Sequence, residues 1–292
     1  MNFTNILNDI ENADLESNSS ATGRRQVLKS FGSKVALAAL PLAVGSLFFN
    51  KAYGKTTDTV ISILNYALEL QFFQYNFYHS ALATGNNTTS TLIPAADRPG
   101  FLMVESQELA QLTFLRNTII GMGGVPFTPN NYPADPATGN PYTPGSYDFT
   151  GGNKFQVYIS YDAFLQVAQA FEDMVVRANL AVLPSLVANT SDIMTQFMQM
   201  NAVQARHSSF VRLVRRFYPD VDYPKPWVTN NMPPAVALQS FYLGEDNTVQ
   251  RGIDITSLPG ITGTLSQTAA TEAFDEPMDM TTVRTLIAPF LI

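Results

Sequence analysis

The sequence contains no cysteine and only two histidines, His79 and His207. The absence of thiols excludes disulfides, thiolate-ligated metals, iron–sulfur clusters and cysteine nucleophiles. With two imidazoles, a site built on several histidines is excluded as well. Charged residues make up only 14% of the 292 residues and apolar residues 46%. The chain therefore has ample material for a buried core and too few charges for a disordered protein.

Basic charge is also scarce, and the net charge is −7. The first 54 residues carry five basic and four acidic groups, which leaves −8 on the remainder. Because nucleic-acid binding depends mainly on cationic side chains, this acidic body argues against a nucleic-acid partner. One arginine cluster lies toward the end of a predicted helix, where we interpret it as complementing the helix dipole. It consists of Arg206, Arg212, Arg215 and Arg216.

Residues 1–54 have the composition of an export signal with a polar leader. Residues 1–23 are rich in Asn and Ser, and an arginine pair follows, with an apolar residue, Leu and Lys after it. This order is similar to the twin-arginine export motif. The sequence therefore predicts export by the twin-arginine route to the periplasm or cell envelope. The motif residues are Arg24, Arg25, Val27, Leu28 and Lys29.

The apolar run that follows, Val35 to Phe49, has 15 residues. This is shorter than the roughly 20 residues that a spanning helix needs. Ala52 and Gly54 are small residues at suitable positions for signal cleavage. Two alternatives stay open: an uncleaved leader that associates with the membrane, and a short buried helix whose arginine pair is unrelated to export.

Four stretches of about 25 residues carry apolar side chains at helical spacing, which predicts four long helices. We expect the first from Thr57 or Asp58 to Gly85, the third from Lys154 or Tyr158 onward, and short links within each consecutive pair. The expected spans are about 57–85, 99–122, 154–187 and 192–217. A segment dense in Pro, Gly and Asn, residues 126–152, separates the second and third.

Helices of this kind bury their apolar stripes best against one another. A long link between the second and third helices lets them run parallel, which is the ferritin-like connection. The sequence therefore predicts an all-α fold, a ferritin-like four-helix bundle over residues 55–217. Residues 218–292 are predicted to form a loop-rich extension that ends in a short amphipathic helix.

The predicted inner stripes carry a few polar residues among the apolar ones. A di-metal carboxylate bundle uses one Glu from each of two helices and Glu-x-x-His from each of the other two. Here the corresponding positions, in chain order, are Gln, Glu-x-x-Gln, Glu and Gln-x-x-His. In each of the two x-x patterns the two residues are three positions apart, which places them on one face of the helix. These residues are Gln71, Glu108, Gln111, Glu172, Gln204 and His207.

Four segments, "LNYALELQFFQYNFY", "SQELAQLTFLR", "AFEDMVVRANLAVLP" and "VQARHSS", resemble the helices of exported ferritin-like proteins, a group that includes plant desiccation-related proteins. The resemblance implies metal ligands at all six inner positions. It implies that Gln71, Gln111 and Gln204 replace ligands, and that Glu108, Glu172 and His207 retain them. The di-metal site is then degenerate, because both terminal ligands of one metal position are lost.

Two hypotheses for the site follow. Glu108, Glu172 and His207 can hold one divalent ion, Fe, Mn or Zn, because two carboxylates balance one such ion. Alternatively, no metal binds: Glu172 pairs with protonated His207, and a neutral Glu108 bonds to Gln111 or Gln71.

The functional hypotheses follow the same division. In the first, the chain is an exported ferritin-like protein that has lost di-iron chemistry, holds no cofactor, and acts as a structural, stress-related or interaction module in the cell envelope. The alternative is a mononuclear metal protein with weak oxidoreductase or metal-sequestering activity through Glu108, Glu172 and His207. Both are compatible with a homo-oligomer, and neither assigns a catalytic residue.

Overall fold

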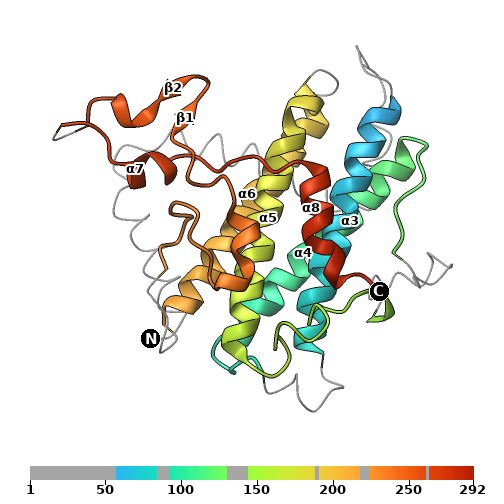
Figure 1. Cartoon of the computed structure of the whole chain (residues 1–292). Helices are drawn as coiled ribbons and strands as arrows, with labels where there is room; N and C mark the ends of the chain where they lie inside the picture. The colour runs from blue at the N-terminus through green and yellow to red at the C-terminus, as the bar shows by residue number, and fades with distance from the viewer. Residues whose placement is uncertain (1–56, 84–91, 130–143, 188–190, 218–223, 261–262) are drawn as a thin grey trace, which may run out of the picture. The chain divides into compact units, whose positions relative to one another are not determined.

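The computed structural model describes residues 57–83, 92–129, 144–187, 191–217, 224–260 and 263–292. The predicted export signal and leader lie outside these residues. Among the described helices, none combines the length and the apolar character needed to cross a membrane. Four long helices dominate (Figure 1): α3 (Thr57–Leu82), α4 (Arg98–Gly121), α5 (Tyr161–Val187) and α6 (Ser191–Arg216).

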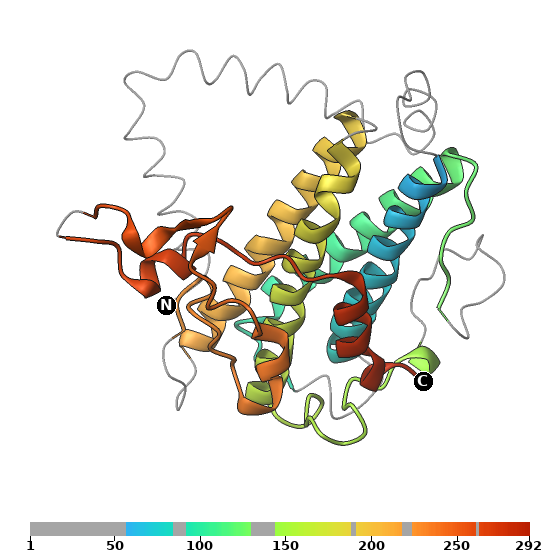
Figure 2. The same ribbon diagram turned by 45° about the horizontal axis from the view of Figure 1, so that its top comes forward.

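The four helices pack as two pairs that face each other. Helix α3 lies along α4 and α5 lies along α6, and the pairs meet where α3 contacts α5. Helices α4 and α5 run in the same direction, as the colour gradient along them shows (Figure 2). The link from α4 to α5 is correspondingly the longest between these helices. The predicted ferritin-like bundle with a long crossover is therefore confirmed.

Two predicted boundaries differ from the structure. Helix α5 begins at Tyr161, later than the predicted start at residues 154–158. The residues before it form turns instead: the Phe155 N–H donates to the Thr150 carbonyl, and the Ile159 and Ser160 N–H groups both donate to the Gln156 carbonyl. The link between α3 and α4 spans residues 83–97, which makes it longer than the short loop we expected.

The middle of α3 (residues 66–78) and of α5 (residues 167–179) is buried on nearly all sides, whereas α4 and α6 keep one face exposed. From Tyr66 to Tyr78 only Glu69 is less than fully buried. Aromatic side chains pack around α3: the Phe73 ring lies edge-on to four other rings, with centroids 4.7–6.1 Å apart. These rings belong to Tyr147, Phe149, Phe171 and Phe290. Segments before α5 and at the C-terminus thus complete the core.

The predicted C-terminal extension consists of loops and short elements. It contains the antiparallel pair β1 (Val249–Gln250) and β2 (Ile253–Asp254) and ends in a short amphipathic helix, as predicted. The Asp279 side chain caps that helix by accepting from the backbone N–H groups of Thr281 and Thr282. That helix is α8 (Met280–Ile287). The other short elements of the extension are η3 (Val236–Tyr242), η4 (Ile255–Ser257), α7 (Gln267–Thr271) and η5 (Ala288–Phe290), and η2 (Pro144–Ser146) lies in the link before α5.

Buried ionic contacts attach this extension to the bundle. Asp173 on α5 accepts hydrogen bonds from Arg212 and from the Tyr242 hydroxyl of η3, the latter at 2.5 Å. Arg177, also on α5, pairs with Glu245 at 2.5 Å and donates to the Phe241 carbonyl at 2.7 Å. Both arginines are at least 96% buried. The extension is therefore joined to α5 by one buried charge pair, Arg177–Glu245, and by the hydrogen bond from the Tyr242 hydroxyl to Asp173.

These contacts correct the interpretation of the arginine cluster. Arg212 is buried against Asp173, and Arg215 is buried with its guanidinium 2.5 Å from Gln169 Oε1. Their role in the interior is to satisfy buried acceptors, so complementing the helix dipole does not explain them.

We predict that Asp173→Ala lowers the free energy of unfolding by about 3–5 kcal/mol, because Arg212 would stay buried without its counter-charge. Urea denaturation measures the loss. Lys225→Ala is the control: it removes an ion pair with Glu272 whose lysine is half exposed, and should cost less than about 1 kcal/mol. Equal losses in the two variants would contradict a dominant role for the buried pair.

Candidate metal centre

Glu108, Glu172 and His207 come together inside the bundle, from α4, α5 and α6 respectively. Each offers one oxygen or nitrogen atom, and these atoms all lie within 4.8 Å of one another. The two carboxylates are fully buried and the imidazole is 3% exposed. The residues singled out from the sequence as retained ligands thus form one group, which we call the Glu–Glu–His group.

One edge of the imidazole faces both carboxylates. His207 Nδ1 lies 2.8 Å from Glu108 Oε1 and 3.8 Å from Glu172 Oε2. The other ring nitrogen, Nε2, lies 2.7 Å from Gln107 Oε1. Because an amide oxygen only accepts, Nε2 carries a hydrogen in this contact.

Helix α3 holds Glu172 by both of its oxygens. The Tyr78 hydroxyl donates to Oε1 at 2.6 Å, and Gln74 Nε2 donates to Oε2 at 3.0 Å. Sequence analysis missed the contacts of Gln74, Gln107 and Tyr78. Because α3 is buried almost throughout from residue 66 to residue 78, periodicity does not distinguish its inner positions there. The usable signal was a glutamine within the aromatic run "FFQYNFY".

The three glutamines that the resemblance gives as replaced ligands lie in different surroundings. Gln204 Nε2 donates to both oxygens of Glu108 at 3.1 Å and to Gln111 Oε1 at 3.0 Å. Gln204 therefore links Glu108 to Gln111. Gln71 is buried, and its Oε1 has no hydrogen-bond partner. Among the described residues of α3, Gln74 and Tyr78 donate hydrogen bonds to the Glu–Glu–His group, and Gln71 does not.

Burial sets the charge state of the group. It raises the pKa of Glu172 to about 8, with the His207 charge opposing and the Glu108 charge adding to the shift. Burial alone would lower the pKa of His207, but the hydrogen bond to Glu108 and the charges of both carboxylates raise it overall. The metal-free arrangement predicted from the sequence pairs Glu172 with His207, and the structure has that contact at 3.8 Å together with a shorter one, 2.8 Å, between His207 and Glu108. The predicted amide partner of Glu108 differs, since Glu108 accepts from Gln204 and not from Gln111 or Gln71.

The group has the chemistry of a site for one divalent ion. Metal bonds of about 2.0–2.2 Å to nitrogen and oxygen require donors less than about 4.4 Å apart. The 2.8 and 3.8 Å contacts of His207 Nδ1 meet this limit. Gln74 Oε1 and Gln204 Oε1 are buried beside the carboxylates without a hydrogen-bond partner. Unsatisfied buried acceptors are costly, and a cation or its bound water would satisfy them.

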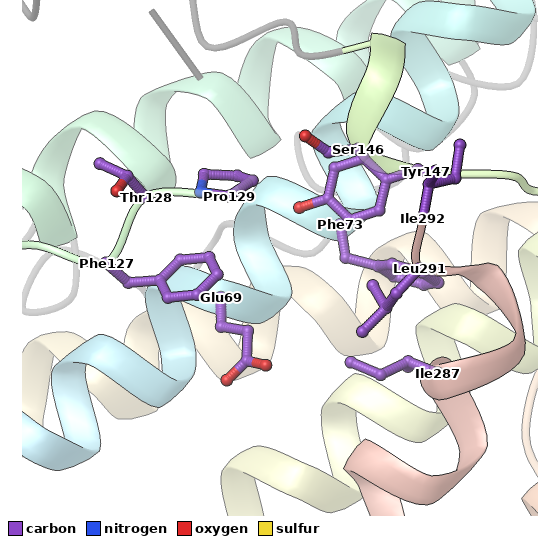
Figure 3. A pocket seen from close by; sticks show the side chains of 10 residues that line it. All are labelled: Glu69, Phe73, Phe127, Thr128, Pro129, Ser146, Tyr147, Ile287, Leu291 and Ile292. Carbon is purple, nitrogen blue, oxygen red and sulfur yellow. The ribbon is translucent and has the colours of Figure 1, made fainter. Parts of the chain in front are cut away.

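Two other features lie apart from the Glu–Glu–His group. His79 Nδ1 is 2.5 Å from Glu105 Oε1 and links α3 to α4. A pocket of about 170 Å³ lies between α3 and the C-terminal residues (Figure 3). Its wall includes Phe73, Leu291 and the Glu69 carboxylate, which accepts from Arg284 at 2.8 Å.

The comparison with protein families agrees with the fold. The family model for the ferritin-like domain matches residues 59–216, from the first turn of α3 to the last residue of α6. The match covers more than half of the chain, so the chain belongs to the ferritin-like domain family. No curated protein matches the chain.

We predict that the metal-free protein becomes less stable as pH rises. Folded Glu172 holds its proton up to about pH 8, whereas an ordinary glutamate loses it near 4.5, so the folded state binds more protons in this window. The free energy of unfolding then falls with pH. His207, whose pKa is raised above 6.5, contributes a fall of the same sign at higher pH.

Glu172→Gln removes the first contribution. In denaturation measured with a chelator present, its free energy of unfolding should fall less between about pH 5 and pH 8 than that of the parent chain. Parallel pH curves for the two proteins would contradict the raised pKa of Glu172.

Proposed function

We propose that this ferritin-like protein binds one divalent ion of Fe, Mn or Zn through Glu108, Glu172 and His207, and that it lacks two-metal oxygen chemistry. The observation that carries the proposal is the convergence of three buried donors from three helices within 4.8 Å. Metal sequestration or weak oxidoreductase activity would follow. When bound, such an ion supplies Lewis-acid chemistry and, for Fe or Mn, one-electron chemistry.

Charge supports one ion and opposes two. Two carboxylates neutralise a single divalent cation, and a second would leave uncompensated charge in a buried site, which costs several kcal/mol. Besides His207, the neighbour of Glu108 is the amide of Gln204, which is bonded in turn to that of Gln111, and an amide oxygen is a weaker ligand than a carboxylate. The half of the centre that contains Glu172 and His207 is therefore the half that we propose to be functional.

A second candidate is a metal-free structural, stress-related or interaction module. The observation in its favour is that the Glu–Glu–His group is already tied by hydrogen bonds: His207 to Glu108, and Tyr78 and Gln74 to Glu172. Such a network can rigidify a bundle core without a ligand.

We also propose that the protein is exported by the twin-arginine route and works in the periplasm or cell envelope, as a relative of desiccation-related ferritin-like proteins. The support is the arginine pair Arg24-Arg25 with its apolar run, and the four helical segments that resemble that group. Export of a folded chain would allow a metal to be loaded before transport.

We predict that protein purified without chelator carries about one metal ion per chain, measured by inductively coupled plasma mass spectrometry. His207→Ala should abolish this content because it removes the only nitrogen donor. The other histidine provides the matched control, and His79→Ala should keep the ion. Adding metal to chelator-treated protein should raise the melting temperature of the parent chain and leave that of His207→Ala unchanged.

Three results would decide against the single-ion proposal. Two ions per chain would refute the charge argument. Binding that survives His207→Ala would place the ion elsewhere. A parent chain that takes up no ion, with an unchanged melting temperature, would favour the metal-free module.

We predict that Arg24→Lys combined with Arg25→Lys stops export, because the twin-arginine route reads the arginine pair itself. Cell fractionation and immunoblotting measure the location of the chain. Arg116→Lys makes the same chemical change in α4 and should leave export intact. A double-lysine variant that reaches the envelope normally would contradict the proposed route.

A further inference from the structure

The Gln107 side chain contacts the edge of His207 that faces away from the carboxylates. Its Oε1 lies 2.7 Å from His207 Nε2, while Nδ1 of the same ring is 2.8 Å from Glu108. Gln107 and Glu108 are consecutive on α4, and consecutive helical side chains project about 100° apart. One turn of α4 therefore contacts the imidazole from both sides.

These contacts bear on how the imidazole can bind a metal. A neutral imidazole carries one hydrogen, and only the nitrogen without it can donate a lone pair to an ion. An acceptor placed at Nε2 favours the tautomer with hydrogen on Nε2. The lone pair of Nδ1 then points toward Glu108 and Glu172, the side where the ion would be held.

We propose that Gln107 is a positioning residue that keeps His207 in the Nε2–H tautomer and presents Nδ1 to the metal. The inference rests on the single-ion function proposed above. An amide suits the role because it accepts a hydrogen bond without adding charge. A carboxylate in its place would accept the same bond and add a third negative charge close to the Glu–Glu–His group.

The affinity of the full chain for zinc tests this role, in competition with a chromogenic chelator after metal removal. Loss of an outer-shell partner of a metal-bound histidine typically weakens binding 10–100-fold. We expect Gln107→Leu, which keeps the size and removes the acceptor, to weaken zinc binding by about this factor. Gln107→Glu restores the acceptor and should bind at least as tightly as the parent chain. Gln199→Leu makes the same change on the exposed face of α6 and should have no effect.

A spectroscopic readout separates positioning from a general structural role. His79→Gln leaves His207 as the only histidine, so its imidazole nitrogens can be assigned by NMR with 15N-labelled histidine. In the zinc-loaded protein we expect a hydrogen on Nε2 that exchanges slowly with solvent, and a metal-shifted Nδ1. In the Gln107→Leu background the Nε2 hydrogen should exchange rapidly.

The outcomes distinguish this inference from the function on which it rests. If the parent chain binds zinc and Gln107→Leu binds it equally well, the positioning role is overturned and the single-ion function stands. The role is also overturned if Gln107→Glu is as weak as Gln107→Leu, or if the zinc-loaded parent carries its hydrogen on Nδ1. A parent chain that takes up no zinc, iron or manganese overturns both.

Discussion

Ionised groups buried inside this bundle need a counter-charge or a polar partner, and the structure depends on meeting that requirement. The middle of α3 (residues 66–78) and of α5 (residues 167–179) is buried almost throughout, so water does not solvate the charged side chains there. Asp173 is balanced by Arg212, and Arg177 by Glu245, while Arg215 donates to the Gln169 amide oxygen. The Glu–Glu–His group differs from the two ion pairs, because two carboxylates face one imidazole. It reaches balance either when Glu172 keeps a proton or when a divalent ion enters.

The two charged clusters are adjacent along the chain. Glu172 belongs to the Glu–Glu–His group and its neighbour Asp173 to the anchor of the C-terminal extension. On α6, His207 likewise belongs to the Glu–Glu–His group, while its neighbour Ser208 donates to Asp173 at 2.5 Å. The same segments of α5 and α6 therefore fix both the candidate ligands and the extension. Tyr242 of η3 reaches Asp173 only because α5 and α6 already present it toward that side.

The fold could be predicted because its signals are local. Helix lengths, the long second link and the C-terminal helix follow from apolar spacing and turn residues, and Glu108, Glu172 and His207 follow from spacing and resemblance. The contacts of Gln74 and Gln107 could not be predicted in the same way. Gln74 lies on a stretch of α3, residues 70–78, in which every residue is buried, so its position carries no periodic signal. Gln107 is defined by a contact with α6, a hundred residues away along the chain.

The glutamines satisfy Glu108 in the core without adding charge. Glutamate at position 204 would place a second carboxylate against Glu108, and without metal the two charges would repel. Gln204 instead donates to both oxygens of Glu108 and to Gln111. The amide thus stabilises Glu108 without a metal at that position, and it leaves Glu108 oriented toward His207. With glutamine at position 204, Glu108 keeps its contact with His207 and the Glu–Glu–His group stays together.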